Sequence, residues 1–397
     1  MTENLFISNS YIAEFTADIV NIIEKNSMFM IELDKTCFYP EGGGQPSDIG
    51  FIGNCSIFDV QYENDKIYHY SKDKPANNLD VKCRIDWNSR FDLMQQHSGQ
   101  HILSSTFEKL FDANTVGFHL SNDTVTIDLD KKLGALELEK AENMSNEIVF
   151  KNLPIIIHYP DKATLNQMPL RKPPKVLKNI RIIEVENFDF SPCGGTHVNN
   201  TGEIGLVKIK KFENHKNGIR LEFVCGNRAL KDYRLKNDLI NKLAADMSVS
   251  PDEIENSYEK SKDDTNLLIT EIKDLKQQLI GYKINDLNEH AEVYDDIKLI
   301  KYEFRDIDMK SVKTISSKIV NEPGYITLFS LVNDDVKLLF ARSKNVDVNM
   351  KDIIKEPLEL INGRGGGSPF AAQGGGNIID NANLAIETAY MHVKSLL

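Results

Sequence analysis

The segment HSGQH at residues 97–101 determines how the rest of the sequence is interpreted. Its two histidines are four residues apart, so on an α-helix their imidazoles lie on one face, separated by about one turn, whose pitch is roughly 5.4 Å. Both can therefore direct lone pairs at a single ion. Almost a hundred residues later, the segment CGGTH at residues 193–197 repeats this spacing with a cysteine and a histidine. Its two glycines favour a tight turn that leads into a helix or loop.

Together the two pairs predict a metal site with three imidazole nitrogens and one thiolate. This donor set suits tetrahedral Zn²⁺ and suits Mg²⁺ poorly, so we expect Zn²⁺ at His97, His101, Cys193 and His197. An isolated His-x-x-x-His pair is equally well explained as two hydrogen-bonded core histidines. A second pair is hard to attribute to accident in a chain with nine histidines and five cysteines. Ser98 stands where a His-Glu-x-x-His protease has its glutamate, which disfavours peptide hydrolysis.

These two pairs resemble the editing domain of alanyl-tRNA synthetase and its freestanding relatives, the AlaX trans-editing proteins. The segment FYPEGGGQPSD at residues 38–48 is similar to the glycine-rich motif of that family. The segments GRGGGSP at residues 363–369 and AQGGG at residues 372–376 resemble its C-terminal DHHA1 domain. The combination of CGGTH with the histidine pair is highly specific, whereas the glycine runs alone are weak signals.

The resemblance implies the long form of AlaX, a cytoplasmic zinc-dependent deacylase with a DHHA1 domain. Its substrate would be tRNA(Ala) carrying serine or glycine, and its reaction the hydrolysis of the aminoacyl ester. One difficulty concerns the metal, because four protein ligands are typical of structural zinc, whereas catalytic zinc keeps one position open. A loose ligand, a five-coordinate ion, and an ion that only orients the substrate while water attacks from elsewhere remain alternatives.

The resemblance also suggests which residues contact the aminoacyl group. Gln100 is the catalytic candidate, because its carboxamide precedes His101 and can reach the serine hydroxyl, although the family usually has Thr or another polar residue there. The glycine-rich motif is expected to form a wall of the pocket. Ordinary core packing explains the two candidates after the helix, Phe118 and His119, at least as well. The proposed substrate contacts are Gly43, Gly44, Gln45, Phe118, His119 and Thr196.

Charge is distributed unevenly along a chain whose net charge is −12. Residues 162–181 and residues 205–236 each sum to +6, and both segments flank the CGGTH motif. A polyanion can therefore be attracted to the metal site while the remaining surface repels it, although two solvated basic faces would give the same pattern. The expected tRNA-binding residues are Lys208, Lys210, Arg220, Arg364, Gly365, Gly366 and Gly367.

The length and residue pattern predict an α+β protein of four parts. Elements expected within them include a helix that opens with a capping box at residues 89–92 and a strand at residues 204–212. An apolar seam at residues 254–282 predicts a coiled coil, and we expect a homodimer through this coil and the C-terminal region, with folding back on the same chain as the alternative. The expected parts are a β-rich, barrel-like glycine-motif domain (1–88), an editing domain with an antiparallel sheet (89–228), a helical linker (229–296) and an α/β DHHA1-like tRNA-binding domain (297–397).

Other classes of protein fit the sequence less well. The five scattered cysteines indicate a reducing compartment, and no apolar segment predicts a signal peptide or membrane span. The glycine-rich segment lacks the features of an ATP-binding loop, and no Asp-His-His triplet indicates a phosphoesterase. About 90 residues before the histidine pair are too few for an aminoacylation core. A non-catalytic, zinc-stabilised tRNA-binding protein remains the alternative to an enzyme; a threonyl-type editing domain is disfavoured by the DHHA1-like segment.

Overall fold

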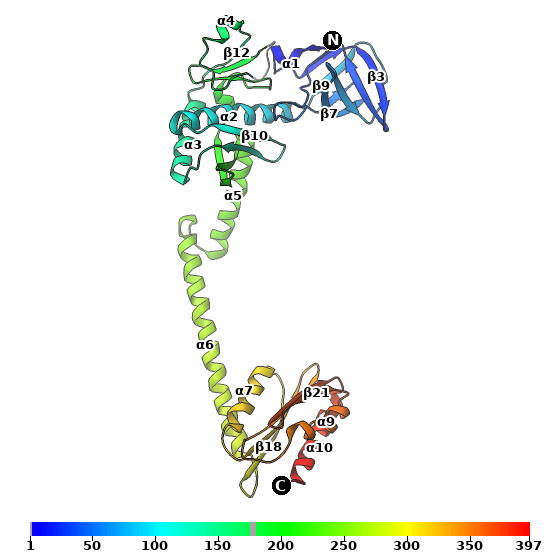
Figure 1. Ribbon diagram of the computed structural model, residues 1–397, viewed down its shortest axis with the longest axis vertical. Coiled ribbons are helices and arrows are strands. Elements are labelled where there is room, and N and C mark those ends of the chain that lie inside the picture. The colour runs from blue at the N-terminus through cyan, green and yellow to red at the C-terminus, as the bar shows by residue number, and fades with distance from the viewer. Residues whose placement is uncertain (1, 175–179) are drawn as a thin grey trace. The chain divides into compact units, whose positions relative to one another are not determined.

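The chain divides into two compact units, Met1–Asp246 and Met247–Leu397 (Figure 1). The computed structural model describes residues 2–174 and 180–397. Several antiparallel sheets and packed helices make it a mixed α+β protein, as predicted. The finer division into four parts stays a prediction. None of the helices in the described residues is both long and apolar enough to cross a membrane.

The first unit begins with a seven-stranded antiparallel sheet. Strand burial alternates in it, since Val81, Cys83 and Ile85 are buried while the residues between them are exposed. Its two end strands are consecutive in the chain, and closure into a barrel stays a prediction. The sheet order is β2 (Glu14–Ala17), β9 (Val81–Ile85), β6 (Gly50–Ile52), β7 (Cys55–Glu63), β8 (Lys66–Ser71), β4 (Met28–Leu33) and β3 (Ile19–Lys25). Three short elements flank it: β1 (Glu3–Asn4), α1 (Leu5–Ser8) and β5 (Lys35–Thr36), which pairs with β1 in parallel.

The second half of this unit packs two helices on a four-stranded antiparallel sheet. The helices are α2 (Trp87–Phe111) and α3 (Ala135–Phe150), and the sheet order is β10 (Thr115–Leu120), β11 (Val125–Leu129), β16 (Gly218–Cys225) and β15 (Val207–His215). A separate three-stranded sheet consists of β12 (Ile155–His158), β13 (Ile182–Val185) and β14 (Asp189–Pro192). Short helices α4 (Lys162–Leu165) and η1 (Thr201–Ile204) lie in the connections, and α5 (Gly226–Met247) follows β16.

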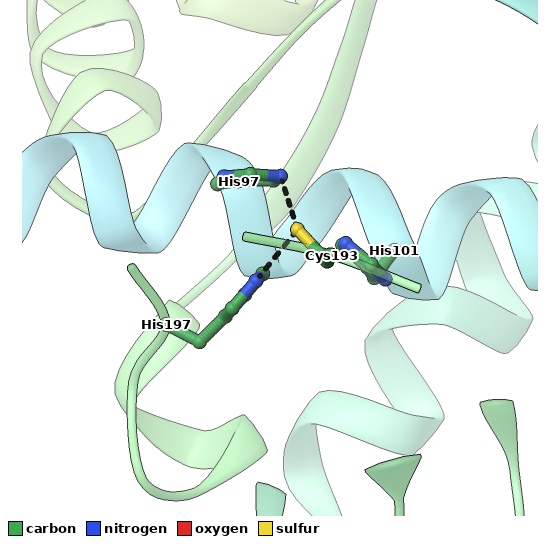
Figure 2. Close-up of side chains that lie close together, drawn as sticks. All are labelled: His97, His101, Cys193 and His197. Carbon is green, nitrogen blue, oxygen red and sulfur yellow. Dashed lines mark hydrogen bonds between the residues drawn. The ribbon is translucent and has the colours of Figure 1, made fainter. Parts of the chain in front are cut away.

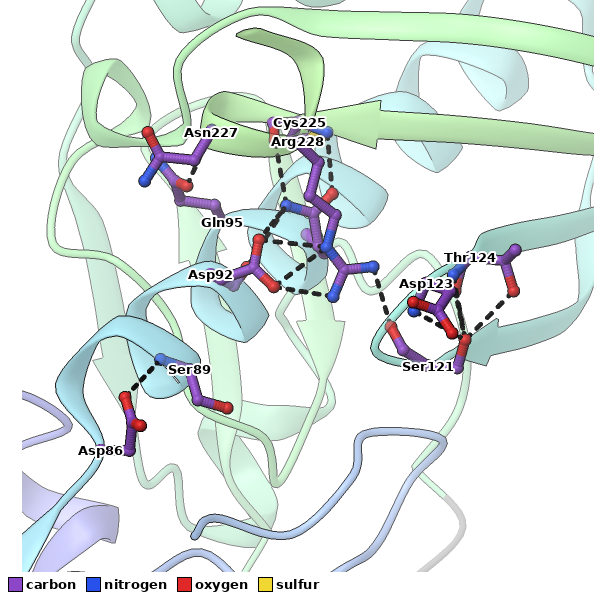
Figure 3. Close-up of polar contacts among 11 residues, drawn as sticks. Asp86, Ser89, Asp92, Gln95, Ser121, Asp123, Thr124, Cys225, Asn227 and Arg228 are labelled. Carbon is purple, nitrogen blue, oxygen red and sulfur yellow. Dashed lines mark hydrogen bonds and ion pairs between the residues drawn. The ribbon is translucent and has the colours of Figure 1, made fainter. Parts of the chain in front are cut away.

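Helix α2 starts earlier than the capping box at residues 89–92 predicts. Its N-cap is Asp86, whose carboxylate accepts a hydrogen bond from the Ser89 backbone N–H at 3.1 Å. Asp92, expected to complete the capping box, instead binds the Arg228 guanidinium of α5 through contacts of 2.7 to 3.0 Å (Figure 3). Arg228 also donates to the Ser121 carbonyl at 2.8 Å. The Asp92 carboxylate therefore forms a tertiary ion pair instead of the capping hydrogen bond that the local sequence predicts.

The strand predicted for residues 204–212 is also displaced in the structure. Residues 201–204 form η1, because Glu203 accepts the Asn200 backbone N–H at 3.1 Å and the buried Thr201 hydroxyl donates to the Ile148 carbonyl at 2.8 Å. Gly205 then turns the chain with a φ of 70°, a conformation that glycine adopts without strain. Strand β15 begins only at Val207.

The second unit contains a six-stranded sheet and the helices that cover it. Strands β18 and β19 pair in parallel, with α7 as the connecting helix, whereas the other neighbouring strands are antiparallel. The sheet order is β17 (Glu292–Tyr294), β18 (Ile297–Phe304), β19 (Tyr325–Val332), β20 (Val336–Arg342), β22 (Ala371–Gly376) and β21 (Arg364–Gly367). The helical segments are η2 (Pro251–Glu253), α6 (Ile254–Glu289), α7 (Met309–Val320), α8 (Met350–Ile353), α9 (Lys355–Leu360), η3 (Ile379–Asn381) and α10 (Ala382–Lys394).

Helix α6 carries the predicted coiled-coil seam on its surface. Its buried side chains, Ile280 and Leu287, belong to a core cluster with residues of α7 and β18. The seam residues Tyr258, Leu268, Ile272, Leu275, Leu279 and Tyr282 are exposed. The helix therefore forms as predicted, and its pairing with a second chain stays a prediction.

Candidate metal centre

Four side chains from the two sequence motifs meet in the first unit (Figure 2). One ligand atom from each of His97, His101, Cys193 and His197 lies within 4.8 Å of the others. The Cys193 sulfur is 3.3 Å from Nε2 of His97 and 3.3 Å from Nε2 of His197. The three histidines are buried, and Cys193 is partly exposed. The structure thus brings together the whole predicted ligand set. We call these four residues the metal cluster, and one metal ion can fill the space between their ligand atoms.

The backbone around Cys193 approaches helix α2 closely because residue 195 is glycine. A Cβ on Gly195 would lie 2.3 Å from Cε1 of His97 and 2.7 Å from Oε1 of Gln45. Neither distance is possible for a real side chain. The second glycine of the motif, Gly194, has no such contact, since a Cβ added there would meet nothing within 4 Å among the described residues. Gly195 is therefore the position that allows the loop to reach the histidine pair.

The nitrogen that each histidine turns away from Cys193 has a polar neighbour. His97 Nδ1 lies 2.8 Å from Gln45 Oε1, and His101 Nδ1 lies 3.3 Å from Asp189 Oδ2. His197 Nδ1 lies 3.1 Å from Ser98 Oγ. Such contacts fix the ring orientation, and the acceptor oxygens of Gln45 and Asp189 place the proton of His97 and His101 on Nδ1, which leaves Nε2 to face an ion. This arrangement is typical of metal-ligating histidines.

Gln45 and Thr196, which we predicted as substrate contacts, hold this arrangement together. Gln45 is completely buried, and its Oε1 accepts hydrogen bonds from His97 and from the Thr196 backbone N–H at 3.1 Å. Its Nε2 donates to Thr196 Oγ1 at 2.8 Å. The glycine-rich motif therefore contacts the metal cluster through its glutamine. The polar atoms of Gln45 are engaged within the protein.

The electrostatics of the cluster favour a thiolate. Burial alone would raise the pKa of Cys193, but the imidazoles of His97 and His197 outweigh burial and hold that pKa well below its usual value. Burial lowers the pKa of His197 to about 3, although Cys193 acts in the opposite direction. Burial also acts to lower the pKa of His101, but hydrogen bonds to Asp189 and Cys193 raise it to about 9. A proton on His101 balances the negative charge of the Cys193 thiolate, as a bound divalent cation would. Metal binding is therefore expected to displace this proton.

Asp189 is a functional residue that the sequence reasoning missed. Besides His101, its carboxylate accepts from Arg171 Nε at 2.8 Å and from Ser191 Oγ at 2.8 Å. Burial tends to raise its pKa, but His101 and Arg171 lower it to about 2, so it is ionised at neutral pH. The available signal was an acidic side chain on the buried face of a strand that leads into the ligand loop.

The other predicted contact residues lie at different distances from the cluster. The Phe118 ring is 5.4 Å from the His97 ring, and Gly44 packs on Phe118, so this part of the glycine-rich motif lies near the site. Gln100 is buried, and its Nε2 donates to Ser104 Oγ at 2.7 Å. His119 is exposed and follows Phe118 in β10, so the two side chains point to opposite faces of the sheet.

The basic residues predicted to bind tRNA fall into two groups. Those of the first unit form ion pairs: Lys208 with Glu142, Lys210 with Glu222, and Arg220 with Asp128. In the second unit, the exposed residues 364–367 form strand β21. Part of this strand borders a cavity of about 460 Å³, which is also lined by Met309, Lys313, Lys337, Gln373, Gly374 and Gly375.

Two family models match the chain. One, described as the threonyl and alanyl tRNA synthetase second additional domain, matches residues 180–222, which include Cys193 and His197. The other is the DHHA1 domain, which matches residues 296–395. Fold and site thus define a protein that joins a tRNA-synthetase-type additional domain, with its His/Cys cluster, to a DHHA1 domain.

Similarity to curated proteins identifies the family. The chain is 33% identical to the alanyl-tRNA editing protein AlaX-L of Pyrococcus horikoshii, over 94% of each chain. It belongs to this family of alanyl-tRNA editing proteins, which confirms the resemblance seen in the motifs. It is also 29% identical to the alanine–tRNA ligase of Methanobrevibacter smithii and 26% identical to that of Pyrococcus abyssi. These matches cover 98% of this chain but only 45% and 43% of the ligases, so the chain spans less than half of their length.

Proposed function

We propose that this protein is a trans-editing hydrolase that removes serine, glycine or both from mischarged tRNA(Ala), with Zn²⁺ as its metal. Membership in the alanyl-tRNA editing family supports the process, and the buried His/Cys cluster supports the chemistry. The observation that carries the proposal is the convergence of His97, His101, Cys193 and His197 on one point beneath the glycine-rich motif. Translation fidelity is the purpose that such a reaction serves.

The donor set fits zinc on chemical grounds. A thiolate and three imidazoles, each with its outer nitrogen hydrogen bonded, match a zinc site with its orienting partners in place. When bound, Zn²⁺ would supply Lewis acidity, which polarises an ester carbonyl or lowers the pKa of a water molecule to about 7. Four protein ligands also complete a tetrahedral set. That feature favours a second candidate function, a zinc-stabilised tRNA-binding protein without catalysis.

Selection of the amino acid is assigned to residues at the edge of the cluster. Ser104 engages the amide nitrogen of Gln100, so the carboxamide oxygen is the group that remains to accept a hydrogen bond from the hydroxyl of a bound serine. Gly43, Gly44 and Phe118 would form an apolar wall beside it. Alanine has no hydroxyl to make this contact, so it gains less from the pocket than serine does. It is also larger than glycine, which adds a small steric penalty.

The tRNA is assigned mainly to the second unit. Arg364, Gly365 and Gly366 border a cavity with Lys313 and Lys337, and Gly367 continues the same exposed strand. Three cations around open backbone suit an RNA phosphate chain. Lys208, Lys210 and Arg220 would add to the tRNA surface only in part, because acidic neighbours offset their charge. A homodimer through the exposed seam of α6 completes the proposal.

The test is deacylation of Ser-, Gly- and Ala-tRNA(Ala) by purified protein, with and without a zinc chelator. We expect chelator-sensitive release of serine or glycine while Ala-tRNA(Ala) is spared, and loss of both zinc and activity in Cys193→Ala. The matched control is Cys55→Ala, a buried cysteine of the N-terminal sheet. Tight tRNA binding without hydrolysis, together with unfolding on chelation, would contradict the hydrolase and establish the second candidate.

A further inference from the structure

A second cavity lies directly beside the loop that carries Cys193. Its volume is about 560 Å³, and its lining comes from four separate segments of the first unit. Gly194, the residue after Cys193, forms part of the wall. Except for one arginine, the lining residues carry no charge. They are Ile7, Tyr159, Pro160, Ile180, Arg181 and Gly194.

The arginine that lines this cavity has hydrogen-bond donors without acceptors among the described residues. Arg181 is only 8% exposed, and its Nη1 donates to the Cys193 carbonyl at 2.9 Å and the Gly195 carbonyl at 2.8 Å. Its Nε and Nη2 are buried, and no group in residues 2–174 or 180–397 accepts a hydrogen bond from either. A buried donor without an acceptor costs about 1–3 kcal/mol, and more when the group is charged. Because protein atoms cover both nitrogens, an acceptor from outside the chain reaches them only when the guanidinium turns toward the cavity.

The two unpaired nitrogens define the chemistry of that acceptor. Nε and Nη2 form one edge of the planar guanidinium, and their parallel N–H groups match two oxygens of one phosphate or carboxylate. None of the ion pairs among the described residues includes Arg181, so none of their carboxylates pairs with its guanidinium. An anion with two oxygens in one plane is therefore the expected ligand.

We propose that Arg181 binds the last phosphodiester of the tRNA, the one that links its 3′-terminal adenosine to the preceding nucleotide. This inference rests on the proposed function. Because the guanidinium holds the carbonyls on both sides of Gly194, it lies immediately behind a ligand of the metal cluster. Of all the phosphates in the tRNA, the last phosphodiester is the one nearest the aminoacyl ester, so it is the one that we assign to this site. Arg181 thus positions the ester by fixing the phosphate one ribose away.

The experiment compares three small seryl esters in steady-state hydrolysis. They are the ester of adenosine, the ester of the dinucleotide CpA, and the ester of CpA whose linkage is an uncharged methylphosphonate. For the native protein we expect kcat/KM on the CpA ester to exceed that on the methylphosphonate by about 10- to 100-fold, the range for hydrogen bonds to a charged group. Arg181→Gln should abolish this difference, and any loss through the ligand loop should lower hydrolysis of all three esters by the same factor, on top of that effect.

Two further variants separate binding from folding. Lys162→Gln removes one exposed charge from the same basic segment and should keep the full preference for the charged linkage. Arg181→Lys keeps the charge without the two-pronged edge and should retain only part of the preference. Zinc content and the fluorescence of Trp87, the only tryptophan of the chain, report on the integrity of each variant.

Two outcomes would overturn the inference. An equal loss on all three esters in Arg181→Gln would mean that the guanidinium acts only through the ligand loop. A native protein that hydrolyses the charged and uncharged linkages equally well would mean that no phosphate is bound there. If the native protein hydrolyses none of the esters, the proposed function fails separately. Equilibrium binding of uncharged CpA and its methylphosphonate then tests Arg181, which again requires tighter binding of CpA that Arg181→Gln abolishes.

Discussion

At the scale of single residues, the metal cluster depends on the groups behind its ligands. The two histidines of α2 and the Cys193–His197 pair were predictable, because fixed spacing in a helix and a loop limits where their atoms can lie. Gln45 and Asp189 come from distant segments, and no spacing relates them to the ligands they hold. Gln45 was assigned to the substrate from the motif alone. Its actual partners depend on tertiary packing, which the sequence pattern does not contain.

Gly195 provides the sharpest test of the cluster. We expect Gly195→Ala to lower zinc affinity about 10- to 100-fold, because a methyl group 2.3 Å from His97 must displace the ring or the loop. Competition with a chromophoric chelator measures the affinity. The matched control is Gly194→Ala, whose added methyl meets nothing within 4 Å. Equal zinc affinity in the two variants would show that the loop does not depend on the close approach.

His69 predicts a pH dependence of stability. It is fully buried between the Thr36 hydroxyl and the Ile31 carbonyl, and burial lowers its pKa to about 4 despite the hydrogen bond to Ile31. Between about pH 6.5 and pH 4, His69 therefore binds a proton in the unfolded state but not in the folded state. The stability contributed by neutral His69 is complete above that pH. It is lost as pH falls towards 4, by about 3 kcal/mol in total.

Urea unfolding at pH 6.5 and at pH 4.5, followed by Trp87 fluorescence, measures this effect. In His69→Gln, which has no titrating ring, the free energy of unfolding should fall less between the two pH values than in the native protein. All other titrating groups are common to both proteins, so they cancel in the comparison. An identical pH dependence would contradict the assignment to His69.

At the scale of elements, helix α2 joins the two halves of the first unit. Near its start, the completely buried Arg90 binds Asp48 of the glycine-rich motif and donates to the carbonyls of Ser10 and Cys37 at 2.6 Å each. Helix α2 was predictable from the spacing of its buried residues. Its first residue was not, because both Asp86 and Ser89 are good N-caps, and the choice depends on Arg228 binding Asp92.

Removal of one partner from the buried pair should destabilise the first unit strongly. We expect Asp48→Asn to lower the free energy of unfolding by about 3–5 kcal/mol, because it leaves the buried Arg90 charge uncompensated. Urea unfolding monitored by Trp87 measures the change. The control is Asp112→Asn, which removes an exposed ion pair with Lys131 and should have little effect. Similar unfolding midpoints for both variants would refute this role of the pair.

At the scale of the whole molecule, the chain separates into two units with cores of their own. Core clusters around residues of α2 and the N-terminal sheet belong to the first unit, and those of the six-stranded sheet belong to the second. Their existence was predictable from the change in pattern along the chain. The boundary at residue 246 lies inside the helical linker predicted for residues 229–296, shortly before Pro251 separates α5 from α6.

This division predicts that hydrolysis and tRNA affinity can be separated by truncation. A protein of residues 1–246 should keep the single-turnover rate of Ser-tRNA(Ala) hydrolysis at saturating tRNA, because it holds the metal cluster and the Arg181 cavity. Its KM should rise about tenfold or more through the loss of the second unit. Rapid-quench kinetics over a range of enzyme concentrations measures both quantities. A large fall in the saturating rate would mean that the second unit takes part in the chemical step.

The five cysteines differ in reactivity, and this difference determines which of them oxidation would reach first. Burial raises the pKa of Cys37, Cys55, Cys83 and Cys225, so these thiols stay protonated and inert. Cys193 alone combines a depressed pKa with partial exposure, the combination that oxidants attack first. A metal ion would shield its sulfur, and loss of the ion would uncover it. Oxidation of that sulfur would then remove one ligand of the metal cluster, so the editing reaction proposed above would depend on the redox state of the cell.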